Sequence, residues 1–397
     1  MTEKKSLIRE NFYKTEMMLR NQGIYPVEGY PIASLFYAYL LYFGFTALIP
    51  LLGFCNIIFA ESSERMGMLS NSFIFFEMGV SMFKHWPFIR HPDITKKMMD
   101  KWTTEMFTSD EPMEMPIIKK SLKAIDFVFY LFLAFSIGGP VGLTLNVLFS
   151  SHDELKLDIY TFGVDVIHNK FLYVLTNVYL IIGYVHGTLG HFAVDIFIAG
   201  LMSHCSLQLS LIKFRLENMD KYLDKDLRSV QDDNTFTEEV NDEIYRRISH
   251  CVDHYDTVMN YVKEIEDMYS VAAFSQFLAG SLVYAICLLY FMQLKALDFN
   301  FVYILTFFFP MIMVVFTYCY YGDRISEESS SIGGAIFSSP FYNYNKKCNS
   351  SLIILMEKTK RPIKFTAGKL LELSLDTFVL IIKRSYSLLA VLRNYNN

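Results

Sequence analysis

Charged residues are scarce in this chain of 397 residues, at 19% against 52% hydrophobic residues. No basic block interleaved with aromatic residues occurs, so the sequence lacks the electrostatic footprint of a nucleic-acid-binding protein. The six cysteines are scattered without a close pair, which predicts neither a disulfide framework nor a zinc site. Phosphate-binding loops, nucleophile elbows and His-Glu-x-x-His motifs are also missing, and we therefore expect no enzymatic activity and no cofactor.

Long apolar stretches are present instead, and six of them are long enough to cross a membrane. A seventh stretch is weaker, because it contains Glu77 and is followed by Lys84 and His85. We interpret it as a span, with a re-entrant or interfacial segment as the alternative. The predicted fold is an all-α membrane protein with seven transmembrane helices, at 33–59, 67–83, 124–149, 171–202, 270–294, 299–321 and 365–392.

Lys and Arg divide sharply between the two sets of loops, with 27 on one side of the predicted membrane and 5 on the other. The richer side is expected in the cytosol, which places the N-terminus inside and the C-terminus outside. A G-protein-coupled receptor has the opposite orientation, and its Asp-Arg-Tyr and Asn-Pro-x-x-Tyr motifs are missing here. The sequence therefore disfavours that class.

The distribution of apolar and polar stretches predicts six regions. Apolar residues at helical spacing in the polar region 203–269 predict two cytosolic helices, split near 231–235, that pack on 343–359 or on neighbouring subunits. The regions are a cytosolic N-terminal segment (1–32), spans one to four (33–202), a cytosolic helical extension (203–269), spans five and six (270–322), a cytosolic helical anchor segment (323–362), and the last span with a short extracellular tail (363–397).

The last predicted span is unusually rich in charge for a membrane helix. If 364–392 forms one helix, Lys369, Glu372, Asp376 and Lys383 lie within about 60° of one another around its axis. Such a face is expected to contact water or partner charges. The sequence therefore predicts a helix at a watery passage or at a helix interface.

Two further patterns lie within the spans. His191 and Asp195 are four residues apart, and because no third ligand has a compatible spacing we favour a hydrogen-bonded pair over a metal site or proton relay. The run from Ser136 to Gly142 contains three glycines and Pro140. It predicts either close helix packing or a cavity left by the missing side chains.

Several stretches resemble the insect odorant receptors, and the resemblance covers most of the chain from the fourth span onward. One departure is Phe341, where the family usually has a Trp. The stretches are DIFIAGLMSHCSLQLSLI from Asp195, ISHCVDHYDTVMNYVKEIEDMYS from Ile248, YCYYGDRISEESSSIGGAIFSSPFY from Tyr318 and RPIKFTAGKLLELSLDTFVLIIKRSYSLLAVLR ending at Arg393.

This resemblance implies a subunit of a heterotetrameric, odorant-gated, non-selective cation channel in the plasma membrane of olfactory neuron dendrites. The loop between the fourth and fifth spans is short, which resembles the variable odorant-tuning subunit and not the shared co-receptor. The implied partners are the co-receptor, a small volatile odorant, the lipid bilayer and permeating cations. A gustatory-type receptor of the same architecture is the alternative, while a secondary transporter is disfavoured because no internal repeat occurs.

The resemblance also implies where the sites lie. An odorant pocket is expected among the outer halves of spans two, three, four and six, and a gate near the outer end of the last helix. The gate leucines have packing against neighbouring spans as their alternative role. Expected pocket residues are Ser136, Gly139 and Leu143, with Phe73, Phe76, Tyr179, Ile182, Tyr303 and Phe307 added; expected gate residues are Leu388, Leu389, Leu392 and Arg393.

Overall fold

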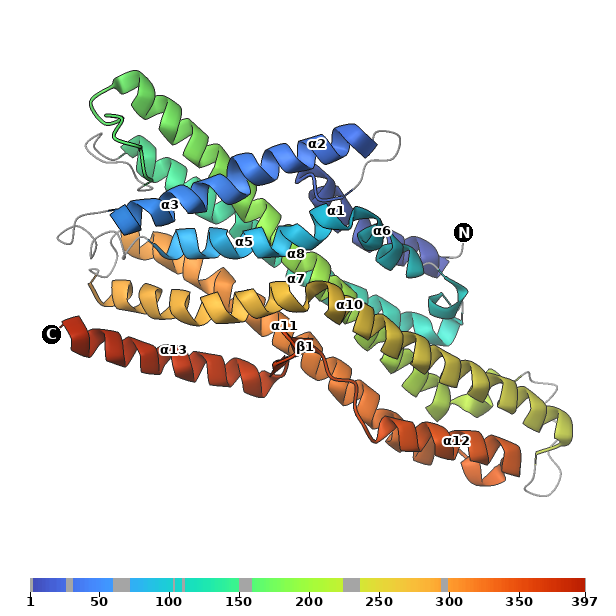
Figure 1. The fold of residues 1–397 in the computed structure, drawn as a ribbon. Coiled ribbons are helices and arrows are strands. Elements are labelled where there is room, and N and C mark those ends of the chain that lie inside the picture. The colour runs from blue at the N-terminus through green and yellow to red at the C-terminus, as the bar shows by residue number, and fades with distance from the viewer. Residues whose placement is uncertain are drawn as a thin grey trace.

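Long helices run roughly along one axis and form an elongated bundle (Figure 1). The computed structural model describes residues 3–25, 31–59, 72–102, 104–108, 111–149, 159–223, 236–293 and 299–396. The two chain termini lie toward opposite ends of the bundle (Figure 1). The helices are α1 (Glu3–Asn21), α2 (Pro31–Leu41), the π-helical η1 (Tyr42–Ala47), α3 (Leu48–Phe59), α5 (Phe73–Arg90), α6 (Pro92–Lys101), α7 (Met115–Phe149), α8 (Lys170–Glu217), α10 (Glu238–Gln293), α11 (Phe299–Ser338), α12 (Lys346–Thr359) and α13 (Leu375–Asn396).

Short elements connect these helices. Four of them are 3-10 turns, and two short strands pair into an antiparallel hairpin. The 3-10 turns are η2 (Glu105–Phe107), η3 (Pro112–Glu114), η4 (Met219–Tyr222) and η5 (Phe341–Asn343), and the strands are β1 (Thr366–Ala367) and β2 (Leu371–Glu372).

Helix α8 is the centre of the bundle and packs against α1, α5, α7, α10 and α11. Its most apolar window is 94% buried, whereas the windows in α2–α3 and α7 are 33% buried. Small residues make this central position possible. A Cβ atom added to Gly183 would lie 2.1 Å from Ile49 Cδ1, and one added to Gly200 would lie 2.6 Å from the Phe12 ring.

Among the described residues, five helical segments are long and apolar enough to cross a membrane. They correspond to the first, third, fourth, fifth and sixth predicted spans. The second and seventh predicted spans correspond to α5 and α13. Each of these two helices carries three or more charged residues and is therefore less apolar. The five segments are Ile32–Phe59, Pro112–Leu145, Lys170–Glu217, Glu238–Leu288 and Ile304–Ser338.

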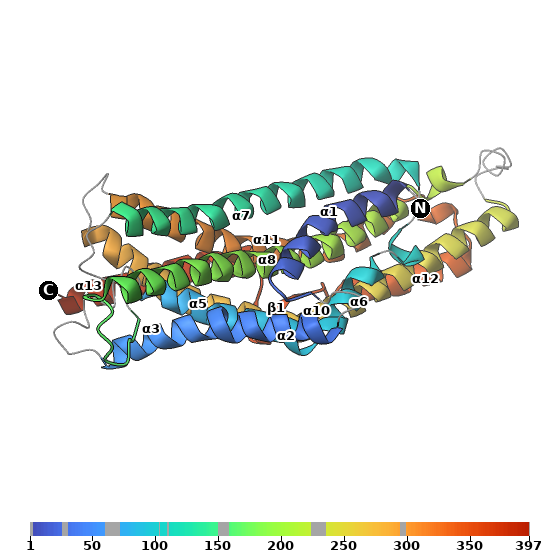
Figure 2. The same ribbon diagram turned by 90° about the horizontal axis from the view of Figure 1, so that it is seen from above.

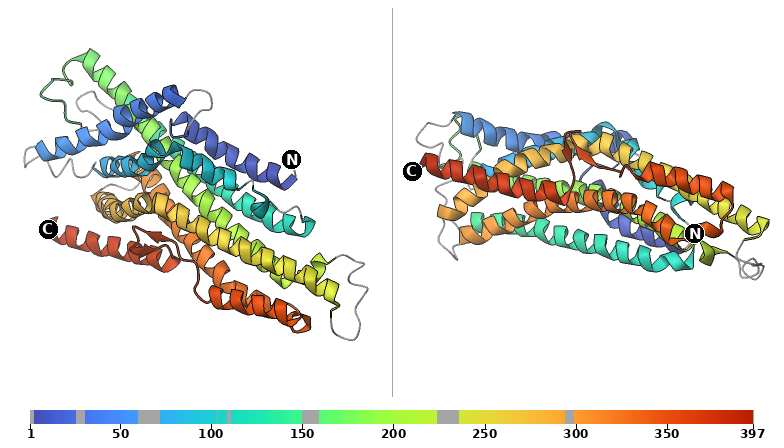
Figure 3. Two further views of the ribbon diagram at one scale, coloured as in Figure 1. Left: turned by 45° about the vertical axis from the view of Figure 1, so that its right-hand side comes forward. Right: turned by 90° about the horizontal axis from the view of Figure 1, so that it is seen from below.

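Three of these segments continue far beyond the length of one membrane crossing. Helix α8 has 48 residues, α10 has 56 and α11 has 40, against about 20 for a single span. Their extensions, together with α12, form one end of the bundle, here called the α12 end (Figures 2 and 3). The two helices predicted within 203–269 are these extensions of α8 and α10, while their predicted split at 231–235 lies outside the described residues.

The prediction of one continuous helix from Lys364 was wrong. Residues 366–372 form the β1–β2 hairpin, and α13 begins only at Leu375. Lys369 and Glu372 therefore belong to the hairpin, and the predicted charged stripe does not exist on a single helix. Lys364 Nζ lies 2.8 Å from Glu372 Oε2 across the hairpin, and Lys369 Nζ lies 3.2 Å from Asp267 Oδ1 of α10.

Local turn and capping residues explain why the helix cannot begin earlier. Gly368 and Lys369 have φ values of 62° and 57°, which are typical of a type I′ hairpin turn and incompatible with a right-handed helix. Ser374 then caps α13, because its Oγ accepts a hydrogen bond from the Thr377 amide at 3.2 Å. Asp376 in the first turn adds a favourable interaction with the helix dipole.

The hairpin is held between α10 and α11. The Gly368 amide donates to the Ser270 carbonyl at 3.0 Å, and the Thr366 amide donates to Glu266 Oε1 at 3.0 Å. On the α11 side, a Cβ atom added to Gly322 would lie 2.3 Å from the Leu373 carbonyl oxygen. The hairpin therefore fixes where α13 starts relative to both helices.

Because Gly322 contacts backbone atoms, we expect Gly322→Ala to displace the chain around Leu373 and to lower stability by about 1–3 kcal/mol, as overpacking does. The measurement is the melting temperature of the purified protein in detergent. Gly334→Ala in the same helix is the matched control, since no described atom lies within 4 Å of a Cβ atom added there. Equal melting temperatures for the two variants would contradict the proposed close contact.

Candidate functional site

A mostly apolar cavity lies where α5, α7, α8 and α11 meet. The cavity is small, with a free volume of about 40 Å³. Missing side chains help to keep it open: a Cβ atom added to Gly139 would lie 3.3 Å from the Tyr184 hydroxyl, and one added to Gly187 would lie 3.3 Å from Met78 Cε. The other apolar lining residues are Ile74, Phe135, Phe192, Phe307, Pro310 and Met311.

Two of the predicted pocket residues, Gly139 and Phe307, line this cavity. Phe73 is buried directly behind the wall, with its ring centroid 4.7 Å from that of Phe307. Leu143 is also buried, one helical turn beyond Gly139. The structure therefore brings the third and sixth predicted spans together at one cavity.

Other predicted pocket residues lie elsewhere. Phe76 packs on Phe54 with ring centroids 5.1 Å apart, and the Tyr179 hydroxyl donates to the Gly44 carbonyl. Ile182 is 51% exposed on the outside of α8. Ser136 donates to the Leu133 carbonyl at 2.8 Å and lines a separate surface depression beside Pro140 and Val185. The side chain of Tyr303 lies outside the described residues.

The cavity ends on a buried polar cluster, here called the ionic network: Glu77, Ser81 and Lys84 of α5, His191 and Asp195 of α8, Gln276 of α10 and Tyr318 of α11. Lys84 and Asp195 have fully buried side chains, and Lys84 Nζ lies 2.7 Å from Asp195 Oδ1. The Tyr318 hydroxyl donates to the same oxygen at 2.5 Å. This pairing allows two charges to be buried, since an unpaired charge in such surroundings is costly.

His191 connects the two halves of the ionic network. Its Nδ1 lies 2.9 Å from Ser81 Oγ, while Nε2 lies 2.9 Å from Lys84 Nζ. The same Nε2 is 2.9 Å from Glu77 Oε1 and 3.2 Å from Asp195 Oδ2. Gln276 Nε2 donates to Glu77 Oε1 at 3.1 Å. Side chains from four helices therefore meet at one point.

His191 Nε2 and Asp195 Oδ2 lie 3.2 Å apart, so the two side chains are neighbours as their spacing predicts, but Oδ2 accepts no hydrogen bond among the described residues. The sequence missed the partners from α5 and α11. The signal was present in Glu77 and Lys84, which share one face of α5 seven residues apart. In the sequence alone these charges weaken the second predicted span. No group of three or more metal-ligating side chains occurs in the described part of the chain.

A second buried charge pair lies in the α12 end of the bundle. Arg215 binds Glu114 through two contacts, Nε to Oε1 at 2.6 Å and a terminal nitrogen to Oε2 at 3.0 Å. The Tyr222 hydroxyl donates to Glu114 Oε1 at 3.2 Å, and burial together with the Glu114 charge raises the pKa of Tyr222. This bidentate pair joins α8 to the segment before α7. We assign it a structural role.

Comparison with known proteins identifies the family. A family model described as 7tm Odorant receptor matches residues 66–386. The chain belongs to the odorant receptor family. The receptor is 22% identical over 409 residues to Odorant receptor Or1 of Anopheles gambiae, a match covering 97% of this chain and 95% of that protein. It is 23% identical over 284 residues to Odorant receptor 2a of Drosophila melanogaster, covering 71% and 70% of the two chains.

Solved structures show the same fold. The receptor superposes on the olfactory receptor OR5 from Machilis hrabei in complex with eugenol with a TM-score of 0.83, at 13% identity, covering 99% of this chain and 100% of that one. The structure of OR5 described without eugenol gives a TM-score of 0.81 over 98% and 99% of the two chains. The receptor is therefore a multi-pass membrane protein of the odorant receptor fold, and its relatives are receptors and not enzymes.

Removing one partner of the Lys84–Asp195 pair is expected to leave a buried charge, at a cost of about 3–5 kcal/mol. We expect Lys84→Met to lower the melting temperature of the receptor strongly, and Lys84→Met combined with Asp195→Asn to recover part of that loss. Lys369→Met is the control, because Lys369 and Asp267 have side chains 73% and 70% exposed. A Lys84→Met protein as stable as this control would argue against the ion pair.

Proposed function

We propose that the receptor is the odorant-tuning subunit of a heterotetrameric, odorant-gated, non-selective cation channel in the plasma membrane of olfactory neuron dendrites. The observation that carries this proposal is the apolar cavity between α5, α7, α8 and α11. Its wall is dominated by aromatic and aliphatic side chains with few polar groups, which suits a small volatile molecule. The related OR5 structure is described as a complex with eugenol, which supports a small-molecule ligand for this fold.

We propose seven membrane crossings, with α5 and α13 as the second and seventh. At about 1.5 Å per residue, the 18 residues of α5 span about 27 Å and the 22 residues of α13 about 33 Å, close to the thickness of a bilayer core. Glu77 and Lys84 of α5 are paired inside the protein and do not face lipid. Termini at opposite ends of the bundle (Figure 1) fit an odd number of crossings.

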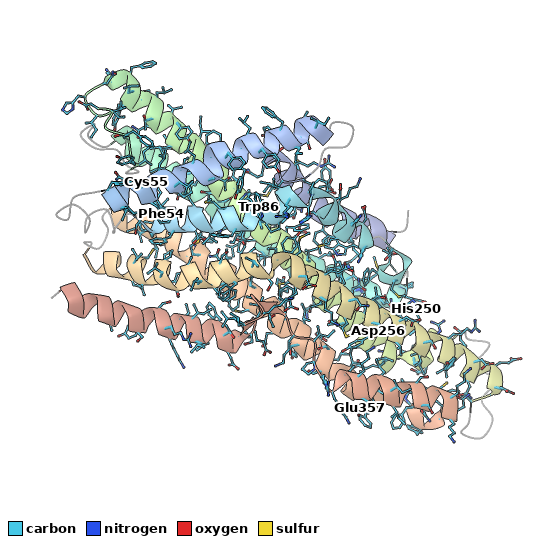
Figure 4. The ribbon with its side chains drawn as sticks, in the orientation of Figure 1. Phe54, Cys55, Trp86, His250, Asp256 and Glu357 are labelled. Atoms are coloured by element: carbon cyan, nitrogen blue, oxygen red, sulfur yellow. The ribbon has the colours of Figure 1, made fainter. Side chains whose placement is uncertain are left out.

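With the N-terminus inside the cell, the α12 end is cytosolic and acts as the inter-subunit anchor. The labelled residues in Figure 4 support a cytosolic α12 end. Phe54 and Cys55 lie toward the opposite end of the bundle, whereas the polar residues His250, Asp256 and Glu357 lie in the α12 end. Ion pairs there include Lys358 with Asp256 and Lys101 with Glu264. Large apolar side chains are nevertheless exposed in this polar region, and neighbouring subunits would cover them: Phe337, Tyr342, Ile353 and Ile354.

The chain fits the tuning subunit because only residues 218–237 separate α8 from α10. The co-receptor is expected to carry a large insertion there. A tuning subunit would then contribute the odorant pocket, and the co-receptor would share the anchor and the pore. Permeating cations and the bilayer are the remaining partners.

We place the pore along α13, which forms an edge of the subunit beside α10 (Figure 3) and is thus available to neighbouring subunits. Leu388, Leu389, Leu392 and Arg393 lie in the last turns of this helix, while their side chains lie outside the described residues. A ring of leucines at this position would block ions by excluding water. An Arg at the mouth would locally oppose cations.

If these leucines form the gate, Leu389→Ala should widen the constriction and raise the basal current without odorant. The measurement is the leak current of the receptor co-expressed with an insect odorant co-receptor, normalised to surface protein. Val379→Ala on the same helix, 45% exposed and nearly three turns earlier, is the control. Identical basal current and ion selectivity in the two variants would remove Leu389 from the gate.

The proposed function is tested by recording odorant-evoked current from the co-receptor with and without this chain. Gly139→Leu should fill the cavity and abolish odorant responses while surface expression is retained. Gly138→Leu is the matched control, because no atom of the described residues lies within 4 Å of a Cβ atom added to Gly138. Odorant-evoked current that does not depend on this chain would refute the proposal, and equal responses from the two leucine variants would place the pocket elsewhere.

A further inference from the structure

A carboxylate at the cavity has one oxygen without a hydrogen-bond partner among the described residues. Glu77 lines the cavity and is only 5% exposed. Its Oε1 is engaged by Gln276 and by His191, whereas its Oε2 is buried and has no hydrogen-bond partner in the part of the chain that the structure describes. Buried carboxylate oxygens are normally satisfied, so an unpartnered one beside a ligand cavity requires an explanation.

The charges of the ionic network sharpen this observation. Lys84 and Asp195 neutralise each other, and Tyr318 donates a further hydrogen bond to Asp195. Glu77 is the remaining carboxylate. With a neutral His191 the network holds one net negative charge, and with a protonated His191 it is balanced. In both states no described residue donates a hydrogen bond to Glu77 Oε2.

The chemistry of the missing group follows from the carboxylate. An ionised carboxylate only accepts hydrogen bonds, so the complementary group must be a donor. Thr188 on the same wall does not supply it, because its hydroxyl donates to the Tyr184 carbonyl at 2.7 Å. Most of the remaining wall is apolar. A matching ligand is therefore largely apolar and carries its donor at one end.

We propose that this cavity selects volatiles that end in a hydrogen-bond donor, a hydroxyl or an ammonium group, which binds Glu77 Oε2. The inference rests on the proposed function, because it takes the cavity as the odorant pocket. Aldehydes, ketones and ethers of the same skeleton bring only acceptors to the carboxylate and are rejected. An ammonium group also neutralises the charge that a neutral His191 leaves in the ionic network.

The test compares ligands of matched skeleton on the receptor co-expressed with a co-receptor: hexanol, hexylamine and hexanal, and benzyl alcohol, benzylamine and benzaldehyde. We expect the alcohols and amines to be at least about tenfold more potent than the aldehydes, the size typical of a hydrogen bond to a charged group. Equal potencies across each series would overturn the inference while leaving the channel function intact.

Glu77→Gln supplies the second measurement. The amide keeps the shape of the side chain, removes the charge and can present an N–H group to the ligand. Amine potency should fall by at least about tenfold and aldehyde potency should rise, so the aldehyde response also reports a folded receptor. Met78→Leu in the same cavity wall is the control and should shift all ligands alike.

The outcomes are distinguishable. An equal shift for amines and aldehydes in Glu77→Gln would overturn the role of Glu77 and leave the pocket in place. If Glu77→Gln does not reach the cell surface, the order of ligand potencies in the unchanged receptor is the test of the inference. A receptor that gives no chain-dependent current with any ligand would refute the proposed function, and the inference would fall with it.

Discussion

Lys84 and Asp195 are buried completely in the middle of a helix bundle that exposes many large apolar side chains. Two opposite charges tolerate such a place only if their geometry is close and further hydrogen bonds support them. Tyr318 from α11 donates to Asp195 Oδ1, and His191 from α8 lies 2.9 Å from Lys84 Nζ, while Asp195 Oδ2 has no hydrogen-bond partner among the described residues. Polar contacts therefore fix the position of α5 against α8 and α11. An apolar interface of similar area would not specify that position.

The cavity depends on the same arrangement. Its floor is the ionic network, and its walls come from three of the helices that the network joins, with α7 as the fourth. Glycines at 139 and 187 leave room where side chains would meet Tyr184 and Met78. Elsewhere on α8, glycines are used for close packing against Ile49 and Phe12. The same residue type thus closes most of the α8 interface and keeps one part of it open.

Much of the helix content could be predicted from hydropathy, because apolar runs of membrane length have few alternative structures. The start of the last helix could not be predicted in this way. Its apolar period continues through 364–374, but Gly368 permits a turn with positive φ, and Ser374 followed by Asp376 is a helix-start signal. Such local signals compete with periodicity, and here tertiary contacts with Ser270 and Glu266 favour the hairpin.

The cavity was only partly predictable for a different reason. Gly139 and Phe307 could be placed from their spans, whereas Tyr184 and Met311 could not, because the rotation of each helix depends on its neighbours. Tyr179 and Ile182 show the error that results: both lie on α8 within two turns of Tyr184 but on other faces. Charged residues inside apolar segments fix the rotation of each helix, because their side chains must contact partners of opposite charge within the bundle.

Helix α10 gives the cavity a physical connection to the last helix. Gln276 contacts Glu77 at the cavity floor, and Ser270 and Glu266, within three turns on the same helix, hold the hairpin that precedes α13. Phe274 lies between them and packs against Gly368 so closely that an added Cβ atom would be 2.8 Å from its ring. A ligand changes the state of a channel only by binding one state better than the other. A ligand that draws Glu77 away from Gln276 in only one state would act on α10 directly, and through the hairpin on the base of α13.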